Sequence, residues 1–218
     1  MKIERMTTKQ RFEYCLQWFG QNMPVAESEL HYDNPFQLLV AVVLSAQCTD
    51  KRVNMVTPEL FRHYPTAEAM AKAEEEDIFM LVKSVSYPNA KSRHLLEMAR
   101  QLTERFEGKV PQTLDELTSL PGVGRKTANV MLSVAFGQGA MPVDTHVYRV
   151  SHRIGLVNEG DNTPLKVEKR LSKYIANDEL GVAHHWLLLH GRYICKSRKP
   201  ECEKCPITAA CKNFSKAN

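Results

Sequence analysis

Lys126 and Asp144 are the two side chains whose positions in the sequence most favour chemistry. Each stands at the expected start of a helix, where the helix macrodipole favours negative charge and opposes positive charge. For Lys126, with Arg125 beside it, this field favours the neutral amine, which is the nucleophilic form that makes a Schiff base. A carboxylate at a helix start could accept a proton or stabilise positive charge in a transition state. Asp144 is equally suited to cap its helix, and a solvated surface position is the commonest place for any lysine.

The sequence around Lys126 indicates a glycine hairpin between two helices. Residues 120–127 read Leu-Pro-Gly-Val-Gly-Arg-Lys-Thr. A dinucleotide-binding fingerprint needs a preceding strand and a third glycine, but the leucines before the motif have helical spacing and Thr127 occupies the glycine's place. A P-loop needs glycine directly before the lysine, where Arg125 stands. Both devices therefore fail, which leaves a simple connection between helices or a phosphate-binding turn.

Gly122 and Gly124 favour the phosphate-binding interpretation of this hairpin. Glycine permits a positive φ in a tight turn, leaves no Cβ in the way, and exposes backbone N–H groups at the start of the second helix. Such donors suit a phosphate of a nucleic-acid backbone and read no base sequence. The residues that we assign to this contact are Gly122, Val123, Gly124 and Arg125.

Four of the six cysteines lie in the last 24 residues and form a candidate metal site. Gaps of six, two and five residues separate Cys195, Cys202, Cys205 and Cys211. Disulfides are disfavoured because the chain shows no signal peptide, and a zinc ribbon usually has two Cys-x-x-Cys pairs where this chain has one. The wide flanking gaps favour a [4Fe-4S] cluster, whose iron corners are more widely spread than the ligand positions of one zinc ion, with zinc as the alternative. We expect Cys15 and Cys48, which lie in helical patterns, to be small buried apolar residues.

The cysteine-bearing tail is also where the positive charge is concentrated. The whole chain carries +4, but residues 190–218 have seven Lys and Arg against two Glu, a net charge of +5, and the other 189 residues carry −1. Three of these cations lie in the six residues between Cys195 and Cys202, in a loop held at both ends, and such a loop could bind phosphate. From this loop we assign Arg198 and Lys199 to a phosphate contact.

Length and composition predict a folded protein without membrane spans. A chain of 218 residues with 43% hydrophobic residues can bury a core without stabilising disulfides or metals, and its length allows one large domain or two modest ones. The longest apolar run, Leu38 to Leu44, is too short for a membrane span, and residues 1–5 lack the apolar stretch of a signal peptide. We therefore expect a cytoplasmic protein.

Apolar residues recur at helical spacing along most of the chain, and few segments alternate as strands do. Asn34 and Pro35 form an N-cap and a first helical residue, and the apolar residues from Phe36 to Leu44 predict a buried core helix. We predict an all-α protein with two helical lobes. Further helices are expected at residues 11–19, 59–64, 67–82, 90–106, 114–120, 126–136, 147–154, 164–175 and 183–189.

These motifs resemble the endonuclease III family, base-excision repair glycosylases of the helix-hairpin-helix superfamily that carry a [4Fe-4S] cluster. The match lies in Leu-Pro-Gly-Val-Gly-Arg-Lys-Thr-Ala-Asn at 120–129, in Val-Asp-Thr-His at 143–146, and in the cysteine spacing. Residues 44–50 resemble the family's Leu-Ser-Ala-Gln stretch, and residues 184–193 resemble the segment that leads into the cluster. The resemblance covers nearly the whole chain.

The resemblance implies two lobes with the active site in the cleft between them. A six-helix lobe with the helix-hairpin-helix would comprise residues 28–138, and an iron–sulfur cluster lobe would comprise residues 1–27 and 139–218. The implied activity is that of a monomeric, bifunctional DNA N-glycosylase and abasic-site lyase. It would remove oxidised pyrimidines from duplex DNA after flipping the damaged base out of the helix.

The resemblance also implies a role for individual residues. Lys126 would attack the sugar C1′, displace the base and form a Schiff base, and β-elimination would then nick the strand 3′ to the abasic site. Asp144 would activate the lysine or stabilise the transition state. Gln47 matches the residue that fills the gap left by the flipped nucleotide. The four cysteines of the tail would hold the cluster.

Residues 85–89, Val-Ser-Tyr-Pro-Asn, depart from the family pattern. The family usually has a glycine here, followed by an intercalating leucine or similar residue and then an aromatic residue. By alignment Tyr87 takes the wedge position, where its ring could stack on the neighbours of the orphaned base, while Pro88 must alter the loop backbone. This departure leaves the damage preference open and does not touch the lysine chemistry.

Two competing functions fit part of the pattern. A mismatch-type adenine glycosylase has the same hairpin and cluster, but such enzymes lack the lysine and usually carry a further C-terminal domain, so Lys126 and the end of the chain at Asn218 argue against it. A non-catalytic DNA-binding module with a structural zinc would explain the hairpin, the basic tail and the cysteines without any role for Lys126 or Asp144.

Overall fold

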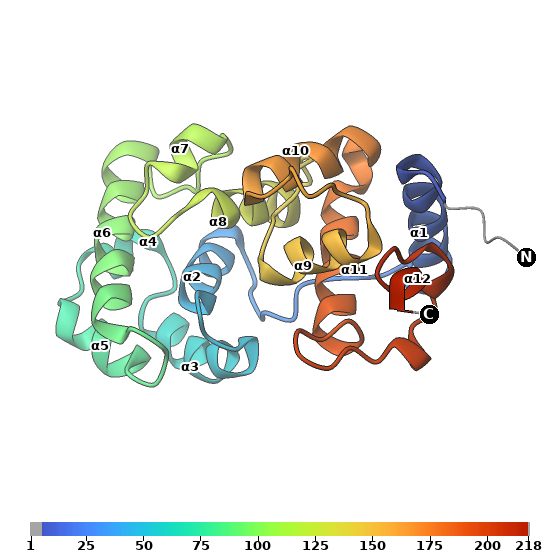
Figure 1. Ribbon diagram of the computed structural model, residues 1–218. Helices are drawn as coiled ribbons and strands as arrows, with labels where there is room; N and C mark the ends of the chain where they lie inside the picture. The colour runs from blue at the N-terminus through green and yellow to red at the C-terminus, as the bar shows by residue number, and fades with distance from the viewer. Residues whose placement is uncertain (1–5, 218) are drawn as a thin grey trace, which may run out of the picture. The chain divides into compact units, whose positions relative to one another are not determined.

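The computed structural model describes residues 6–217, and every regular element in that range is helical (Figure 1). No strand occurs among these residues, so the all-α prediction is confirmed. The chain forms two compact units, one of Ser28–Gly137 and one of Met1–Glu27 together with Gln138–Asn218. Within the described range no helix combines the length and the apolar character needed to span a membrane. Residues 1–5, where we expected no signal peptide, lie outside the described residues.

The unit Ser28–Gly137 is built around α2 (Pro35–Ser45). The Asn34 side chain caps this helix by accepting a hydrogen bond from the Gln37 N–H at 3.0 Å, and Pro35 is its first residue, as predicted. Every residue from Phe36 to Leu44 is buried, which confirms the core helix. The helices that pack against α2 are α3 (Asp50–His63), α6 (Pro88–Phe106), α8 (Arg125–Val130) and the π-helical turn η1 (Met131–Ala135).

Three short helices complete this unit. Both α4 (Ala67–Ala71) and α5 (Glu75–Val82) lie against the long helix α6, and α7 (Leu114–Thr118) lies against α8 (Figure 1). We predicted one helix over residues 67–82, but the structure has two. The second begins with Glu75, Glu76 and Asp77, and these three acidic residues favour a helix start there because the macrodipole stabilises negative charge at an N-terminus.

Most of the other helices also differ in extent from the prediction, three of them for a clear local reason. The segment 59–64 belongs to α3, which begins at Asp50 because the Thr49 side chain accepts a hydrogen bond from the Arg52 N–H. Helix α6 begins at Pro88 rather than at residue 90, since proline suits the first helical position. The helix predicted over 126–136 is α8 followed by the wider turn η1.

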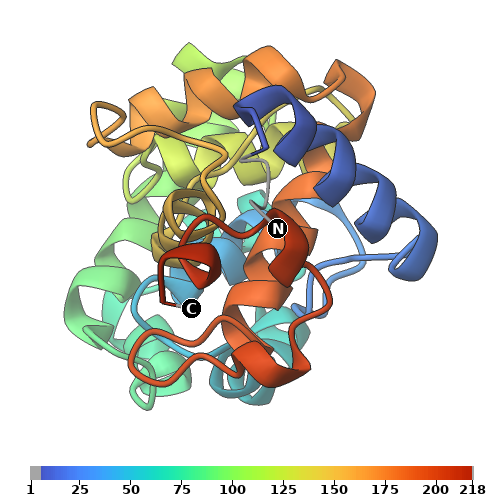
Figure 2. The same ribbon diagram turned by 45° about the vertical axis from the view of Figure 1, so that its right-hand side comes forward.

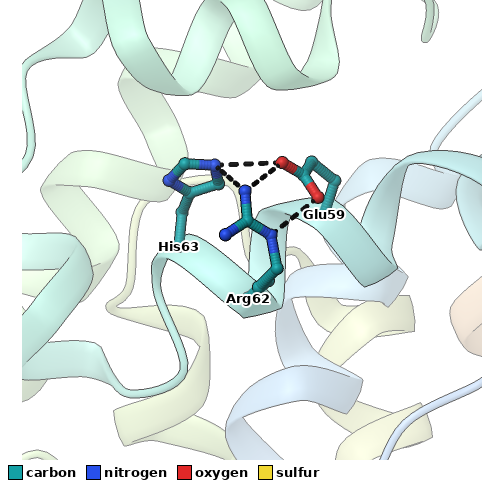
Figure 3. Close-up of polar contacts among 3 residues, drawn as sticks. All are labelled: Glu59, Arg62 and His63. Carbon is teal, nitrogen blue, oxygen red and sulfur yellow. Dashed lines mark hydrogen bonds and ion pairs between the residues drawn. The ribbon is translucent and has the colours of Figure 1, made fainter.

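The last turn of α3 carries an exposed cluster of Glu59, Arg62 and His63 (Figure 3). Arg62 Nε donates to Glu59 Oε2 at 2.9 Å, and His63 Nε2 lies 3.0 Å from Glu59 Oε1. The hydrogen bond from Arg62 lowers the pKa of Glu59 to about 2. Because all three side chains are exposed, this cluster adds little stability beyond placing the Arg62 cation at the end of a helix, where the macrodipole favours it.

The other unit contains the two ends of the chain. Its helices are α1 (Thr8–Asn22), α9 (Thr145–Ile154), α10 (Pro164–Tyr174), α11 (Leu180–Tyr193) and α12 (Phe214–Ala217), with short 3₁₀ turns η2 (Asn177–Glu179), η3 (Cys202–Lys204) and η4 (Thr208–Ala210). Helix α9 packs against α10 and α11 (Figure 2). The turn η4 packs against α1. The cysteine-bearing tail is therefore joined directly to the N-terminal helix.

Aromatic stacking and one buried cation hold this unit together. The Phe19 and Trp186 rings stack with their centroids 5.8 Å apart, and Trp186 Nε1 donates to the Met23 carbonyl at 2.7 Å. The buried Arg11 guanidinium donates to the carbonyl oxygens of Ala210 and Ile154. These contacts join α1 to α11, to the end of α9 and to the turn η4 just before Cys211.

Candidate functional site

The glycine hairpin joins α7 to α8, as predicted. The Val123 N–H donates to the Leu120 carbonyl at 3.1 Å and closes the turn. Gly122 has a φ of +76°, and a Cβ at this position would lie 3.1 Å from His94 Cβ. Gly124 has a φ of −87° and open space where a Cβ would stand. Of the two glycines that permit a positive φ, Gly122 adopts one, whereas Gly124 is the N-cap of α8 with an ordinary φ.

Gly124 contrasts with the N-caps at seven other helices of this chain. There a side-chain oxygen accepts a hydrogen bond from the N–H group three residues later, and the seven capping residues are Thr7, Asn34, Thr49, Thr66, Thr113, Asp144 and Thr163. Gly124 supplies no such oxygen to the first turn of α8 and places no side chain beside it. This leaves room for a phosphate oxygen to approach the helix start.

Lys126 and Asp144 both stand at helix starts, as predicted. Lys126 is the second residue of α8 and is half-buried in the unit Ser28–Gly137. Asp144 belongs to the other unit and caps α9, where its Oδ1 accepts a hydrogen bond from the Val147 N–H at 2.8 Å. Capping engages Oδ1, and Oδ2 is a second basic oxygen on the same half-buried carboxylate.

Gln47 and Tyr87, which we assigned to the gap left by a flipped nucleotide and to the stack beside it, both have a strained backbone conformation. Their φ angles are +54° and +56°, and among the described residues the third non-glycine residue with a positive φ is Glu107, at the end of α6. A left-handed conformation costs a non-glycine residue about 1–2 kcal/mol, and such strain gathers at functional sites. Both side chains are exposed, Tyr87 by 64%.

Pro88 stands at the start of a helix. It is the first residue of α6, where its fixed φ suits the helix and its missing N–H is not needed. Tyr87 is the N-cap and has a left-handed conformation. In this chain a helix thus begins directly after the wedge position.

Two side chains hold the loop that carries Gln47. The buried Lys91 ammonium, on α6, donates to the carbonyls of Leu44 at 2.8 Å and Ala46 at 2.7 Å. Burial lowers the pKa of Lys91, while the C-terminal end of α2 is a favourable place for a cation. The Ser86 hydroxyl donates to the Gln47 carbonyl at 2.7 Å.

Neither Lys91 nor Ser86 was given a role from the sequence. For Lys91 a signal was present, because it stands one helical turn before Leu95 on a stripe that continues with Met98 and Leu102, all of them buried. A lysine on an apolar stripe marks a buried cation that must have acceptors. For Ser86 no signal existed, since its acceptor lies 39 residues away along the chain.

The four cysteines of the tail line one pocket, together with His190 and Arg153. Burial raises the pKa of the Cys205 and Cys211 thiols, so a cation is needed there to hold them as thiolates. Among the described residues, no group of three or more His, Cys, Asp or Glu side chains is arranged to hold a single metal ion.

The basic loop between Cys195 and Cys202 is anchored by two arginines of α9. Arg153 donates to the carbonyls of Lys196 and Ser197, both at 2.7 Å, and Arg149 donates to the Cys195 carbonyl at 3.1 Å. These anchors were not expected, although two arginines four residues apart share one face of a helix. The side chains of Arg198 and Lys199 on this loop are exposed.

Glu201 neutralises part of the positive charge around this loop. Its carboxylate binds Lys196 and, at 3.0 Å, Lys204. The hydrogen bond from Lys196 is the main reason that the pKa of Glu201 falls to about 2. Of the three cations in the loop, Lys196 is thus paired within the protein, whereas Arg198 and Lys199 project from the anchored backbone.

The two cysteines outside the tail, and His190 on α11, have surroundings that indicate structural roles. Cys15 is buried, and burial raises the pKa of its thiol to about 12, which confirms an apolar role. Cys48 is half-buried in the loop after α2, so its predicted helical position was wrong. Burial lowers the pKa of His190 to about 4, which makes it neutral at pH 7, and its ring packs edge-on against Phe19.

Comparison with known proteins adds independent information about this arrangement. The model of the HhH-GPD superfamily base excision DNA repair proteins matches residues 40–177. Endonuclease III of Rickettsia felis is 47% identical over 197 residues, which cover 90% of this chain and 92% of that protein. Endonuclease III of Bacillus subtilis is 43% identical over 211 residues, which cover 97% of this chain and 96% of that protein.

A solved structure is similar over nearly the same extent. A trapped endonuclease III–DNA covalent intermediate superposes with a TM-score of 0.91 at 44% sequence identity. The superposition covers 97% of this chain and 99% of the other. Similarity in both sequence and fold therefore extends beyond the hairpin to the whole chain.

The two hairpin glycines should respond differently to substitution by alanine. Gly122→Ala should lower the free energy of unfolding by about 2 kcal/mol, because the new Cβ would be held at a positive φ and against His94. Gly124→Ala should cost less than about 1 kcal/mol, since its φ is ordinary and its surroundings are open. Urea denaturation of both variants measures the difference, and equal losses would contradict this description of the turn.

Proposed function

This chain belongs to the HhH-GPD superfamily of base excision DNA repair proteins and acts as a DNA glycosylase and abasic-site lyase on damaged pyrimidines, and we propose that Lys126 is its nucleophile and Asp144 its assisting carboxylate. The substrate is duplex DNA. The finer assignment, to oxidised pyrimidines and to strand cleavage 3′ to the abasic site, belongs to the same proposal. The observation that carries it is the position of Lys126, one residue inside a helix that begins with an uncapped glycine turn.

The proposed chemistry starts with the neutral Lys126 amine. Nζ attacks C1′ of the flipped nucleotide as the bond from C1′ to the base breaks, and the base leaves with the bonding electron pair. The nitrogen then loses a proton, the sugar ring opens, and a Schiff base joins Nζ to C1′. Removal of a C2′ proton lets the 3′ phosphate leave by β-elimination. Hydrolysis of the imine returns the lysine.

Asp144 supplies a carboxylate that one hydrogen bond holds in place. The N–H of Val147 fixes Oδ1, so the orientation of the whole group is set by the start of α9. We infer that Oδ2 accepts the proton lost by the lysine amine or stabilises the positive charge that develops on the sugar. The two tasks, capping and chemistry, use different oxygens of one carboxylate.

Phosphate contacts orient the duplex in this proposal. The turn from Gly122 to Arg125, which leads into α8 and has no Cβ at its two glycines, offers backbone donors to one phosphate. The exposed Arg198 and Lys199 provide a second contact from an anchored loop. Gln47 fills the gap left by the flipped nucleotide, and the ring of Tyr87 stacks on the neighbours of the orphaned base. We assign the helix-hairpin-helix lobe to residues 28–138 and the cluster lobe to residues 1–27 and 139–218.

We further propose that Cys195, Cys202, Cys205 and Cys211 hold a [4Fe-4S] cluster. The observation that supports this assignment is that the four cysteines, which are widely spaced in the sequence, line one pocket. When bound, the cluster would supply four bonds that tie this segment together. The basic loop would then be held by those bonds at its ends and by Arg149 and Arg153 along its length.

Borohydride should trap the protein covalently on duplex DNA that carries an abasic site, because reduction of the Schiff base makes the bond from Nζ to C1′ permanent. Lys126→Ala should abolish trapping, whereas Lys169→Ala, which removes an exposed lysine of α10, should trap as well as the wild type. Gel electrophoresis of the adduct measures the yield. Undiminished trapping by Lys126→Ala would contradict the assignment.

Asp144→Asn should separate the chemical task of this residue from its capping task. Asparagine caps a helix as well as aspartate does, so the free energy of unfolding should change by less than about 0.5 kcal/mol. The base-excision rate should fall by a factor of about 100 or more. Asp144→Ala should lose the activity and also about 1 kcal/mol of stability. Single-turnover kinetics and thermal denaturation provide the two measurements, and an Asn variant with wild-type rates would refute a chemical role.

The cluster proposal predicts a yellow-brown protein with about four irons per chain, from the four-thiolate ligation of a cubane cluster. Cys202→Ser should lower the iron content and the visible absorption. Cys15→Ser is the matched control, because Cys15 lies outside the proposed ligand set. A colourless, fully active protein that contains one zinc ion would refute the cluster.

A further inference from the structure

The Gln47 loop and the Tyr87 turn are held together by three hydrogen bonds. Lys91 donates to the carbonyls of Leu44 and Ala46, on the segment that leads into Gln47, and Ser86 donates to the carbonyl of Gln47 itself. Lys91 and Ser86 flank Tyr87 in the sequence. The two exposed side chains assigned to DNA insertion are therefore carried on one hydrogen-bonded assembly, although 40 residues separate them.

The Ser86 bond acts on a strained residue. Gln47 is left-handed, with a φ of +54°, and a residue in this conformation readily relaxes unless its surroundings hold it. The hydroxyl of Ser86 fixes the Gln47 carbonyl at 2.7 Å and thereby fixes the peptide plane that follows Gln47. The ammonium of Lys91 fixes the carbonyl that precedes Gln47. Both peptide groups around Gln47 are thus restrained from the side on which Tyr87 stands.

Ser86 stands where the family pattern has a glycine, which has no side chain to make this bond. The neighbouring departures lie in the same turn, because Pro88 starts α6 directly after Tyr87, which is left-handed as well. The chain therefore combines a restraint on Gln47 with a rigid start for the helix behind Tyr87. Both reduce the freedom of the two side chains before DNA arrives.

We propose that Ser86 is a positioning residue that couples the Gln47 loop to the Tyr87 turn, so that both side chains enter the duplex as one preformed unit. This inference rests on the proposed function, because it assigns a task to the same insertion residues. The physical gain is preorganisation: a loop that is ordered before binding loses less conformational freedom on binding. The effect should be felt where a stacked base must be expelled, and hardly at all where no base remains.

Two duplexes that differ only at the lesion test this coupling. One carries an oxidised pyrimidine and the other a preformed abasic site at the same position. Ser86→Ala should slow single-turnover base excision on the first about 5- to 10-fold, the worth of one lost hydrogen bond, and should change strand cleavage on the second less than 2-fold. Ser86→Thr keeps a hydroxyl and should restore excision to within about 2-fold of the wild type.

Ser84→Ala is the matched control, because Ser84 is exposed two residues earlier and should leave both rates unchanged. Ser86 is partly exposed, so Ser86→Ala should unfold within about 1 °C of the wild type. An equal loss on both duplexes, or no loss on the first, would overturn the coupling. A wild-type protein that cleaves neither duplex would instead refute the proposed function on which the coupling rests.

Discussion

Burial of α2 is the constraint on which the unit Ser28–Gly137 depends. Its residues from Phe36 to Leu44 are all buried, and burying a large aliphatic or aromatic side chain is worth about 1.5–3 kcal/mol. A helix that is apolar on every side must be covered on every side, so α3, α6, α8 and η1 pack around it. This packing sets the positions of two of the proposed site residues. Gln47 follows the end of α2, and Lys126 lies in the first turn of a helix that covers α2.

The end of this buried helix creates a second constraint, because its last carbonyls have no partners within the helix. Lys91, on α6, donates hydrogen bonds to the carbonyls of Leu44 and Ala46 at this end. The same contact restrains the loop that holds Gln47 in a left-handed conformation. The strained conformations of Gln47 and Tyr87 are thus maintained beside a core whose rigidity comes from the burial of α2. In the other unit, Arg149 and Arg153 likewise restrain a loop, because they donate hydrogen bonds to the backbone of the basic loop. The side chains of Arg198 and Lys199 on that loop stay exposed.

Local signals predicted the all-α class, the core helix with its Asn34 cap, the glycine hairpin and the cap at Asp144, because each depends on residues within one turn of each other. Long-range contacts escaped prediction for the opposite reason. The bond from Ser86 to Gln47 joins segments 39 residues apart, and the bonds from Arg153 reach 43 and 44 residues along the chain. The backbone of Gly124 could not be predicted, because a glycine can serve either as a left-handed turn residue or as an N-cap, and only packing decides between them.

Mapping of the covalent adduct tests the central claim most directly. After borohydride reduction on abasic DNA and digestion of both partners, tandem mass spectrometry locates the residue that carries the sugar remnant. We expect the modification on Lys126 and an unmodified peptide containing Asp144. A sugar remnant on another lysine or on the amino terminus, with Lys126 unmodified, would contradict this claim.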